Sequence, residues 1–119
     1  MNYFTYLLIA LLLSILPGGV RAEFVFAHIN ESIMPVERGS KYEDPLDAYL
    51  REKGIGEVTG GGSSLTTAGG IEWVGVDIEL AAPPKNIQLV ARKLKLLGAP
   101  RGSFLEYSVG EQKYTVPIK

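Results

Sequence analysis

The chain contains no cysteine, a single histidine and no surplus of basic residues. The lack of cysteine excludes disulfides, thiolate metal sites and a cysteine nucleophile. The lone His28 excludes any mechanism or metal site that needs two histidines. The formal net charge of −1 leaves no positive surplus to neutralise a nucleic-acid backbone. We therefore expect no cofactor, no bound metal and no nucleic-acid partner.

The length and composition are those of one small globular domain. The chain has 119 residues, of which 46% are hydrophobic and 21% are charged. Because a typical domain has about 100–200 residues, there is no room for a second core.

The first 22 residues have the parts of a secretory signal peptide. The apolar run Tyr6–Leu16 has eleven residues, about half the length of a membrane-spanning helix. The helix-breaking residues 17–19 (PGG) follow, and Val20 and Ala22 occupy positions −3 and −1 of a cleavage point after Ala22. The segment before the apolar run lacks lysine and arginine.

These features predict export, with cleavage after Ala22 to leave residues 23–119 as a single periplasmic or secreted domain. Cleavage removes Arg21 and changes the formal net charge from −1 to −2. Two alternatives remain open. Residues 6–16 can act as an uncleaved membrane anchor, or the start codon can be misassigned ahead of a cytosolic domain.

The pattern after the signal segment predicts alternating strands and helices. Aromatic and β-branched residues predict a strand over Glu23–Ile29, and the polar stretch Asn30–Glu43 is predicted to be a loop. A short helix is predicted from Asp44 as a cap, Pro45 in the first turn and Gly54 as a stop. Further strands are predicted over Gly56–Leu65, Ile71–Leu80, Ser103–Val109 and Gln112–Ile118, and a second helix from Asn86 to Gly98.

This order indicates an α+β fold. Strand and helix alternate as β-α-β-β-α-β, and an extra C-terminal hairpin strand follows. One arrangement that satisfies the order is a ferredoxin-like βαββαβ antiparallel sheet with two helices packed on one face.

Four short motifs are spread over most of residues 24–107. They are MPVERG at 34–39, YEDPL at 42–46, GIGEVTGGG at 54–62 and GAPRGS at 98–103. The pattern resembles a small bacterial domain family of unassigned function. Members of that family begin near Phe24, so the signal segment is a departure from it. The resemblance implies no activity and no binding residues.

Alternation along the strands suggests a binding surface on the sheet face turned away from the helices. Aromatic residues anchor protein interfaces, and acidic residues steer a basic partner toward them. The alternatives are that the tail strand or the Asn30–Glu43 segment covers the aromatic residues, and that the lone histidine is structural. The residues of this hypothesis are Phe24, Phe26, His28, Trp73, Asp77 and Glu79.

A glycine-rich stretch is the second candidate site. Gly60, Gly61 and Gly62 are followed by Ser63 and Ser64, and such backbone can form an anion-binding nest. A phosphate-binding loop also needs a following helix and usually a lysine, which the stretch lacks. The structural alternative is a glycine bulge that twists the sheet, or close backbone approach across it.

These observations favour a small exported protein-binding module without enzyme activity, such as an inhibitor or immunity-type protein that acts on an envelope partner. The first alternative is a homodimer that self-associates through two open sheet faces. A more distant alternative is a hydrolase that uses Asp77, Glu79 and His28.

The signal-peptide hypothesis predicts the N-terminus of the exported protein. Because cleavage follows Ala22, the protein recovered from the envelope fraction is expected to begin at Glu23. Intact-mass spectrometry measures this directly. A chain that retains Met1 contradicts cleavage and favours the membrane anchor.

Overall fold

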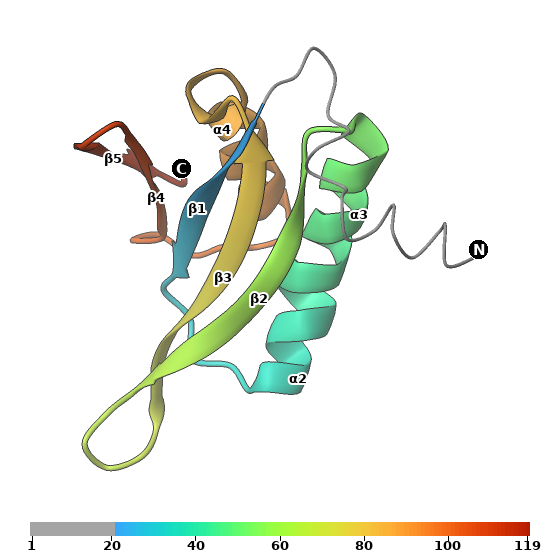
Figure 1. Ribbon diagram of the computed structural model, residues 1–119. Helices are drawn as coiled ribbons and strands as arrows, with labels where there is room; N and C mark the ends of the chain where they lie inside the picture. The colour runs from blue at the N-terminus through green and yellow to red at the C-terminus, as the bar shows by residue number, and fades with distance from the viewer. Residues whose placement is uncertain (1–20) are drawn as a thin grey trace, which may run out of the picture.

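The computed structural model describes residues 21–119, and the predicted signal segment up to residue 20 lies outside that range. Five antiparallel strands form one sheet in the order β2-β3-β1-β4-β5 (Figure 1). β1 (Ala22–Ile29) lies inside the sheet, between β3 and β4. The other strands are β2 (Gly56–Leu65), β3 (Ile71–Ala81), β4 (Phe104–Val109) and β5 (Gln112–Pro117).

Two main helices, α3 (Asp44–Lys53) and α4 (Pro83–Leu96), pack on one face of this sheet (Figure 1). This confirms the predicted α+β class and the antiparallel sheet with two helices. Because β5 is added at one edge, the five-strand order differs from that of a four-stranded ferredoxin-like sheet. Among residues 21–119, no helix is both long enough and apolar enough to cross a membrane.

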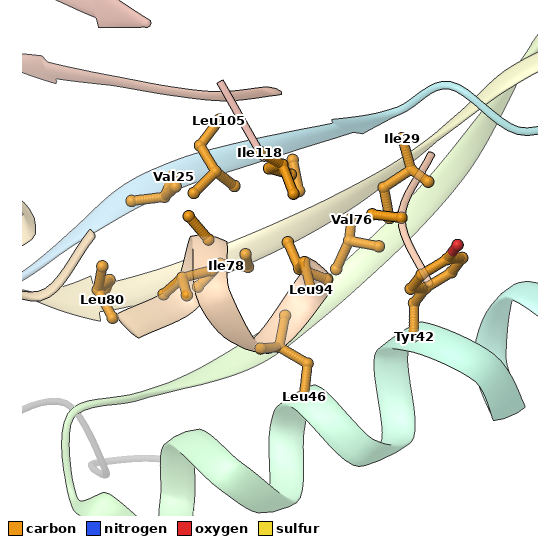
Figure 2. Close-up of a cluster of buried hydrophobic side chains, with 14 of the residues drawn as sticks. Val25, Ile29, Tyr42, Leu46, Val76, Ile78, Leu80, Leu94, Leu105 and Ile118 are labelled. Atoms are coloured by element: carbon orange, nitrogen blue, oxygen red, sulfur yellow. The ribbon is translucent and has the colours of Figure 1, made fainter. Parts of the chain in front are cut away.

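Strict alternation in β1 and β3 builds the core. Successive side chains of a strand point to opposite faces, so every second residue can be aliphatic and buried. Removal of one such buried leucine or isoleucine side chain costs about 2–5 kcal/mol of stability. The fully buried residues include Val25, Ala27 and Ile29 of β1, Val74, Val76, Ile78 and Leu80 of β3, and Leu46, Leu50, Val90 and Leu94 of the helices (Figure 2).

The loop predicted over Asn30–Glu43 is wrong in its second half. The short helix α2 (Pro35–Arg38) and the π-helical turn η3 (Gly39–Glu43) run directly into α3. Asp44 has helical backbone angles and is not a cap. Pro45 cannot donate a backbone hydrogen bond and its ring crowds the carbonyl four residues back. The wider turn accommodates this, since the Asp44 N–H bonds the Gly39 carbonyl five residues back.

Tyr42 explains why the helix extends this far. Its side chain is completely buried against the sheet (Figure 2). Its hydroxyl donates a hydrogen bond to Glu31, and Lys41 pairs with the other Glu31 oxygen at 2.8 Å. Burial raises the pKa of Glu31, but the hydrogen bonds from Lys41 and Tyr42 outweigh that effect and lower it. This cluster ties the segment after β1 to the helix.

The second helix also starts earlier than its sequence predicts. α4 begins at Pro83 and not at Asn86, because prolines suit the first helical turn as well as they end a strand. Ala82 turns the chain with a positive φ of 43°. Asn86 is buried in the helix, where its side-chain amide donates to the Ala81 carbonyl at 2.7 Å.

The C-terminal hairpin agrees with its prediction. β4 and β5 pair from Val109 with Gln112 through Phe104 with Pro117. Gly110 occupies the turn with a φ of 62°, which favours glycine. Beyond β5, the Ile118 N–H donates to the Ser103 carbonyl at 2.9 Å, and the Ile118 side chain joins the core.

Gly75 offers a test of this packing. A Cβ atom added there would lie 2.6 Å from two ring atoms of Phe26, so the ring must move. We expect Gly75→Ala to lower the free energy of unfolding by about 1–3 kcal/mol, measured by chemical denaturation.

Gly62 is the matched control because it is the register partner of Gly75 on β2. A Cβ atom added to Gly62 meets nothing within 4 Å. Gly62→Ala is therefore expected to be neutral or stabilising, since glycine weakens a strand interior. Equal stability of the two variants contradicts the packing described here.

Candidate functional site

The six residues of the predicted surface lie on the sheet face opposite α3 and α4, here called the open face. In the register of β1 with β3, Phe24 pairs with Glu79, Phe26 with Asp77, and His28 with Gly75. The residues between them are fully buried toward the helices. The structure therefore places the predicted residues of β1 next to those of β3 on one face. The segment 30–43 packs beside α3 rather than over this face (Figure 1).

An aromatic row crosses the open face. The His28 ring stacks between Trp73, at 4.0 Å between ring centroids, and Phe104, at 4.5 Å. Phe26 meets Trp73 edge to face at 6.0 Å. The row thus runs over β3, β1 and β4. Edge-to-face and offset contacts of this kind stabilise beyond the area that they bury.

Phe104 and Glu106 are members of the open face that the sequence analysis missed. Register pairs His28 with Phe104 and Phe26 with Glu106. The signal was present in the alternation of β4, because Leu105 is fully buried and its two neighbours must face the other way.

His28 is a packed residue of this row. Its pKa is lowered from the ordinary value of 6.5, because burial disfavours the charged ring more than Glu106 and Glu72 favour it. A stacked, neutral imidazole fits a structural role better than a role as a proton carrier.

Carboxylates surround the aromatic row. Asp77 and Glu79 come from β3 and Glu106 from β4, and the Glu106 side chain approaches Lys113 at 3.8 Å. Burial raises the pKa of Glu79, with Glu57 and Glu23 adding to the effect. Among residues 21–119, no group of three or more His, Asp or Glu side chains lies close enough to hold a metal ion.

The glycine-rich stretch lies inside β2 and is not a loop. Gly60 pairs with Asp77, Gly61 with Val76, and Gly62 with Gly75. All three have ordinary strand backbone without a positive φ. An anion nest needs successive amides turned to one side by left-handed residues, so this geometry favours the structural alternative of a bulge and close approach.

A β-bulge in β2 determines whether each glycine lies on the open face or on the helix side of the sheet. The register shifts between Val58 and Gly60, so Thr59 is the extra residue. Gly60 and Gly62 consequently share the open face with Asp77 and Gly75. Gly61 faces the helices, where the Arg38–Glu43 ion pair (2.6 Å) lies directly over it and leaves no room for a side chain.

The two predicted sites meet in one hollow of about 230 Å³ on the open face, here called the glycine hollow. Glycine and serine residues of β2 form one side, and residues of β1 and β3 form the other. The lining residues are Phe26, Gly61, Gly62, Ser63, Ser64, Trp73, Gly75 and Asp77.

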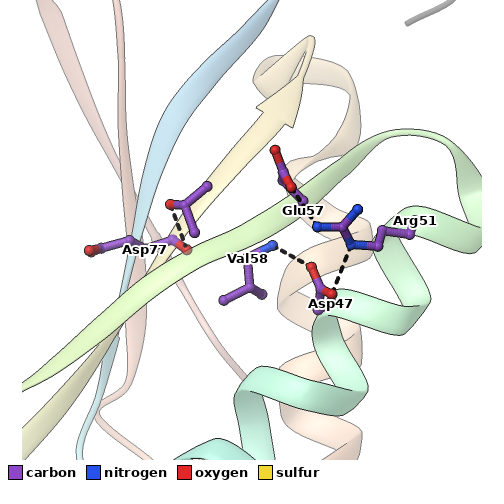
Figure 3. A network of polar contacts seen from close by, with 6 residues as sticks. Asp47, Arg51, Glu57, Val58 and Asp77 are labelled. Atoms are coloured by element: carbon purple, nitrogen blue, oxygen red, sulfur yellow. Dashed lines mark hydrogen bonds and ion pairs between the residues drawn. The ribbon is translucent and has the colours of Figure 1, made fainter. Parts of the chain in front are cut away.

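The outer edge of β2 is partly closed by α3 (Figure 3). Asp47 accepts the Val58 N–H at 2.8 Å and pairs with Arg51 at 2.8 Å. Arg51 in turn reaches Glu57 at 2.6 Å. Because the Val58 N–H is occupied, this part of the edge does not offer a free ladder for another strand.

A hollow lined by basic residues lies beside the C-terminal residues, where it adjoins the aromatic row at Phe104. It measures about 550 Å³, and its lining includes Lys95, Arg101 and Lys119. The molecule thus has an acidic aromatic face and a basic end.

Comparison with known proteins found no matching family model, no matching curated protein and no matching solved structure. The family resemblance of the four motifs therefore stays a prediction.

The position of His28 between two rings has a measurable consequence. Because the folded state disfavours the protonated ring, the pKa of His28 is expected to lie below 6.5. The unfolded chain then binds the proton more tightly, so the free energy of unfolding decreases as the pH falls below 6.5. The chain has one histidine, so its ring protons give an unambiguous titration by NMR.

Phe104→Leu removes one flanking ring and is expected to move the His28 midpoint upward. Tyr114→Leu, on β5 outside the row, is the control and is expected to leave the midpoint unchanged. A midpoint at or above 6.5 in the unaltered protein refutes the buried, stacked histidine.

Proposed function

We propose that the protein is a small exported binding module that holds a partner protein through its open face. One observation carries the proposal. A row of aromatic side chains lies on an uncovered face of the described chain and is surrounded by carboxylates. Phe24, at the end of β1, is 52% exposed.

The shape of the open face supports a protein partner. Phe24 and Phe26 line a hollow of about 340 Å³ that also includes Glu106 of β4, and Phe26 borders the glycine hollow on its other side. Buried aromatic anchors that fit pockets dominate the energy of protein interfaces. A face with aromatic residues and adjoining hollows offers such anchoring points.

The charge of the face favours a basic partner. Asp77, Glu79 and Glu106 lie beside the aromatic residues, and Lys113 is paired with Glu106. An acidic surface attracts a basic one and speeds the encounter. The same charge opposes binding to nucleic acid. An inhibitor or immunity-type protein that covers a basic site of an envelope enzyme is the specific form that we propose.

We also propose a finer description of the fold, as a ferredoxin-like split βαβ arrangement with β5 added at one edge. The place of β1 between β3 and β4, with both main helices on one face, supports it.

Self-association and hydrolysis are less well supported. Two copies joined through their open faces bring Asp77, Glu79 and Glu106 of each copy together, and like charges repel. A hydrolase needs a residue that can accept a proton, whereas His28 is stacked between two rings.

Affinity capture from the native envelope fraction tests the proposal. The tagged protein is expected to retain a foreign protein in stoichiometric amount, as read by intact-mass spectrometry. Phe24→Ser is expected to lower recovery at least about tenfold, because loss of a central interface anchor typically costs about 2 kcal/mol or more. Added salt is expected to slow association.

Leu96→Ser is the matched control. Leu96 is 82% exposed but lies on α4, on the helix side, so recovery is expected to be unchanged. A partner retained equally by the Phe24 variant, or a protein recovered only with itself, contradicts the proposal.

A further inference from the structure

The glycine hollow differs from the rest of the open face because its floor at Gly62 carries no side chain, while the neighbouring Gly75 lies under the Phe26 ring. Gly62 and Gly75 are register partners on β2 and β3, so two neighbouring positions of one sheet face lack a Cβ atom. Aromatic rings of Phe26 and Trp73 and the carboxylate of Asp77 surround this floor. The result is a small depression with two apolar walls and one negative wall.

Packing within the chain accounts for only one of the two glycines. At Gly75 an added Cβ atom would lie 2.6 Å from the Phe26 ring, so the ring would have to move. Gly62 has no such neighbour, and its backbone has no positive φ. Glycine inside a strand lowers stability by roughly 0.5–1 kcal/mol relative to alanine. No contact among residues 21–119 requires glycine at position 62, but a side chain there would occupy the hollow.

Asp77 supplies the charge of the hollow. A Cβ atom added at Gly60 would lie 3.4 Å from Asp77 Oδ2, so the carboxylate lies close to β2 at the rim. None of the ion pairs formed among residues 21–119 uses Asp77. Figure 3 shows its side chain directed away from α3 and the cations there. This carboxylate is free to pair with a group that enters from outside.

The size of the hollow fits a side chain better than a metabolite. Its volume is about 230 Å³, below the range of roughly 300–1,000 Å³ that is typical of small-molecule pockets. Aromatic faces attract cations, and arginine does so more often than lysine. A guanidinium group is planar, stacks on aromatic rings and pairs with a carboxylate through two hydrogen bonds.

We propose that the glycine hollow takes one arginine side chain of the partner protein. The guanidinium then lies against Trp73 and pairs with Asp77, while the floor at Gly62 leaves space for the stem. This inference rests on the proposed protein-binding function, and it names the chemistry at the centre of the interface.

The protein carries its own reporter for a direct test. Trp73 is the only tryptophan of the chain, so its fluorescence reports occupation of the hollow. Titration with N-acetyl-arginine methylamide is expected to give a saturable change. The uncharged N-acetyl-norleucine methylamide is expected to give none. Absence of a saturable response to the arginine probe, or an equal response to the norleucine probe, overturns the proposal.

Two variants locate the site of binding. Gly62→Val places a side chain in the hollow at a position where an added Cβ atom meets nothing within 4 Å, and Asp77→Asn removes the charge. Each is expected to weaken binding of the arginine probe at least about fivefold. Gly39→Ala is the matched control, since its Cβ atom also meets nothing within 4 Å but lies in η3. Unchanged affinity in the Asp77 variant overturns the proposal even if the Gly62 variant fails to fold.

Capture of the partner distinguishes the proposed arginine site from the proposed protein-binding function. Loss of the partner in both Phe24→Ser and Asp77→Asn supports both. Loss in the Phe24 variant with full retention in the Asp77 variant overturns the arginine site and leaves the binding module intact. Retention in both variants overturns the proposed function itself.

Discussion

The pairing of β1 with β3 sets which side chains of the two central strands face the helices. Its register sets Val25 against Ile78 and Phe26 against Asp77, so the buried residues of the two central strands are aliphatic and the opposite face is aromatic and acidic. A slip of one residue would exchange the two faces. The helices pack on the aliphatic face, and the open face is what this arrangement leaves for binding.

Local patterns predicted the strands well and the helix boundaries less well. The alternation of aliphatic and other residues in β1 and β3 can be read from the local sequence, and the aliphatic residues of each alternation are the buried ones. The helix before Asp44 was missed because Asp44-Pro45 matches a helix start. The helical conformation before Asp44 is instead stabilised by the burial of Tyr42 and its hydrogen bond to Glu31, and both depend on tertiary contacts. Likewise, Pro84 suits a strand end and a first helical turn equally well.

The candidate site was predictable strand by strand but not across strands. Six residues of the open face followed from alternation, whereas Phe104 required the register of β1 with β4. The glycine hollow required more. Without the bulge at Thr59, Gly61 would face the open side opposite Gly75, and Gly62 would face the helices. A single extra residue therefore merges two apparently separate sequence features into one surface, and residue spacing alone does not reveal it.

Carboxyl footprinting of the captured complex identifies the surface that meets the partner. Carbodiimide labelling, read by mass spectrometry, reports the accessibility of each acidic side chain in the free and bound protein. If the open face holds a basic partner, labelling of Asp77, Glu79 and Glu106 falls on binding, while that of Glu52, exposed on α3, stays unchanged. Protection of Glu52 with continued labelling of the three open-face carboxylates contradicts the account and places the interface on the helices.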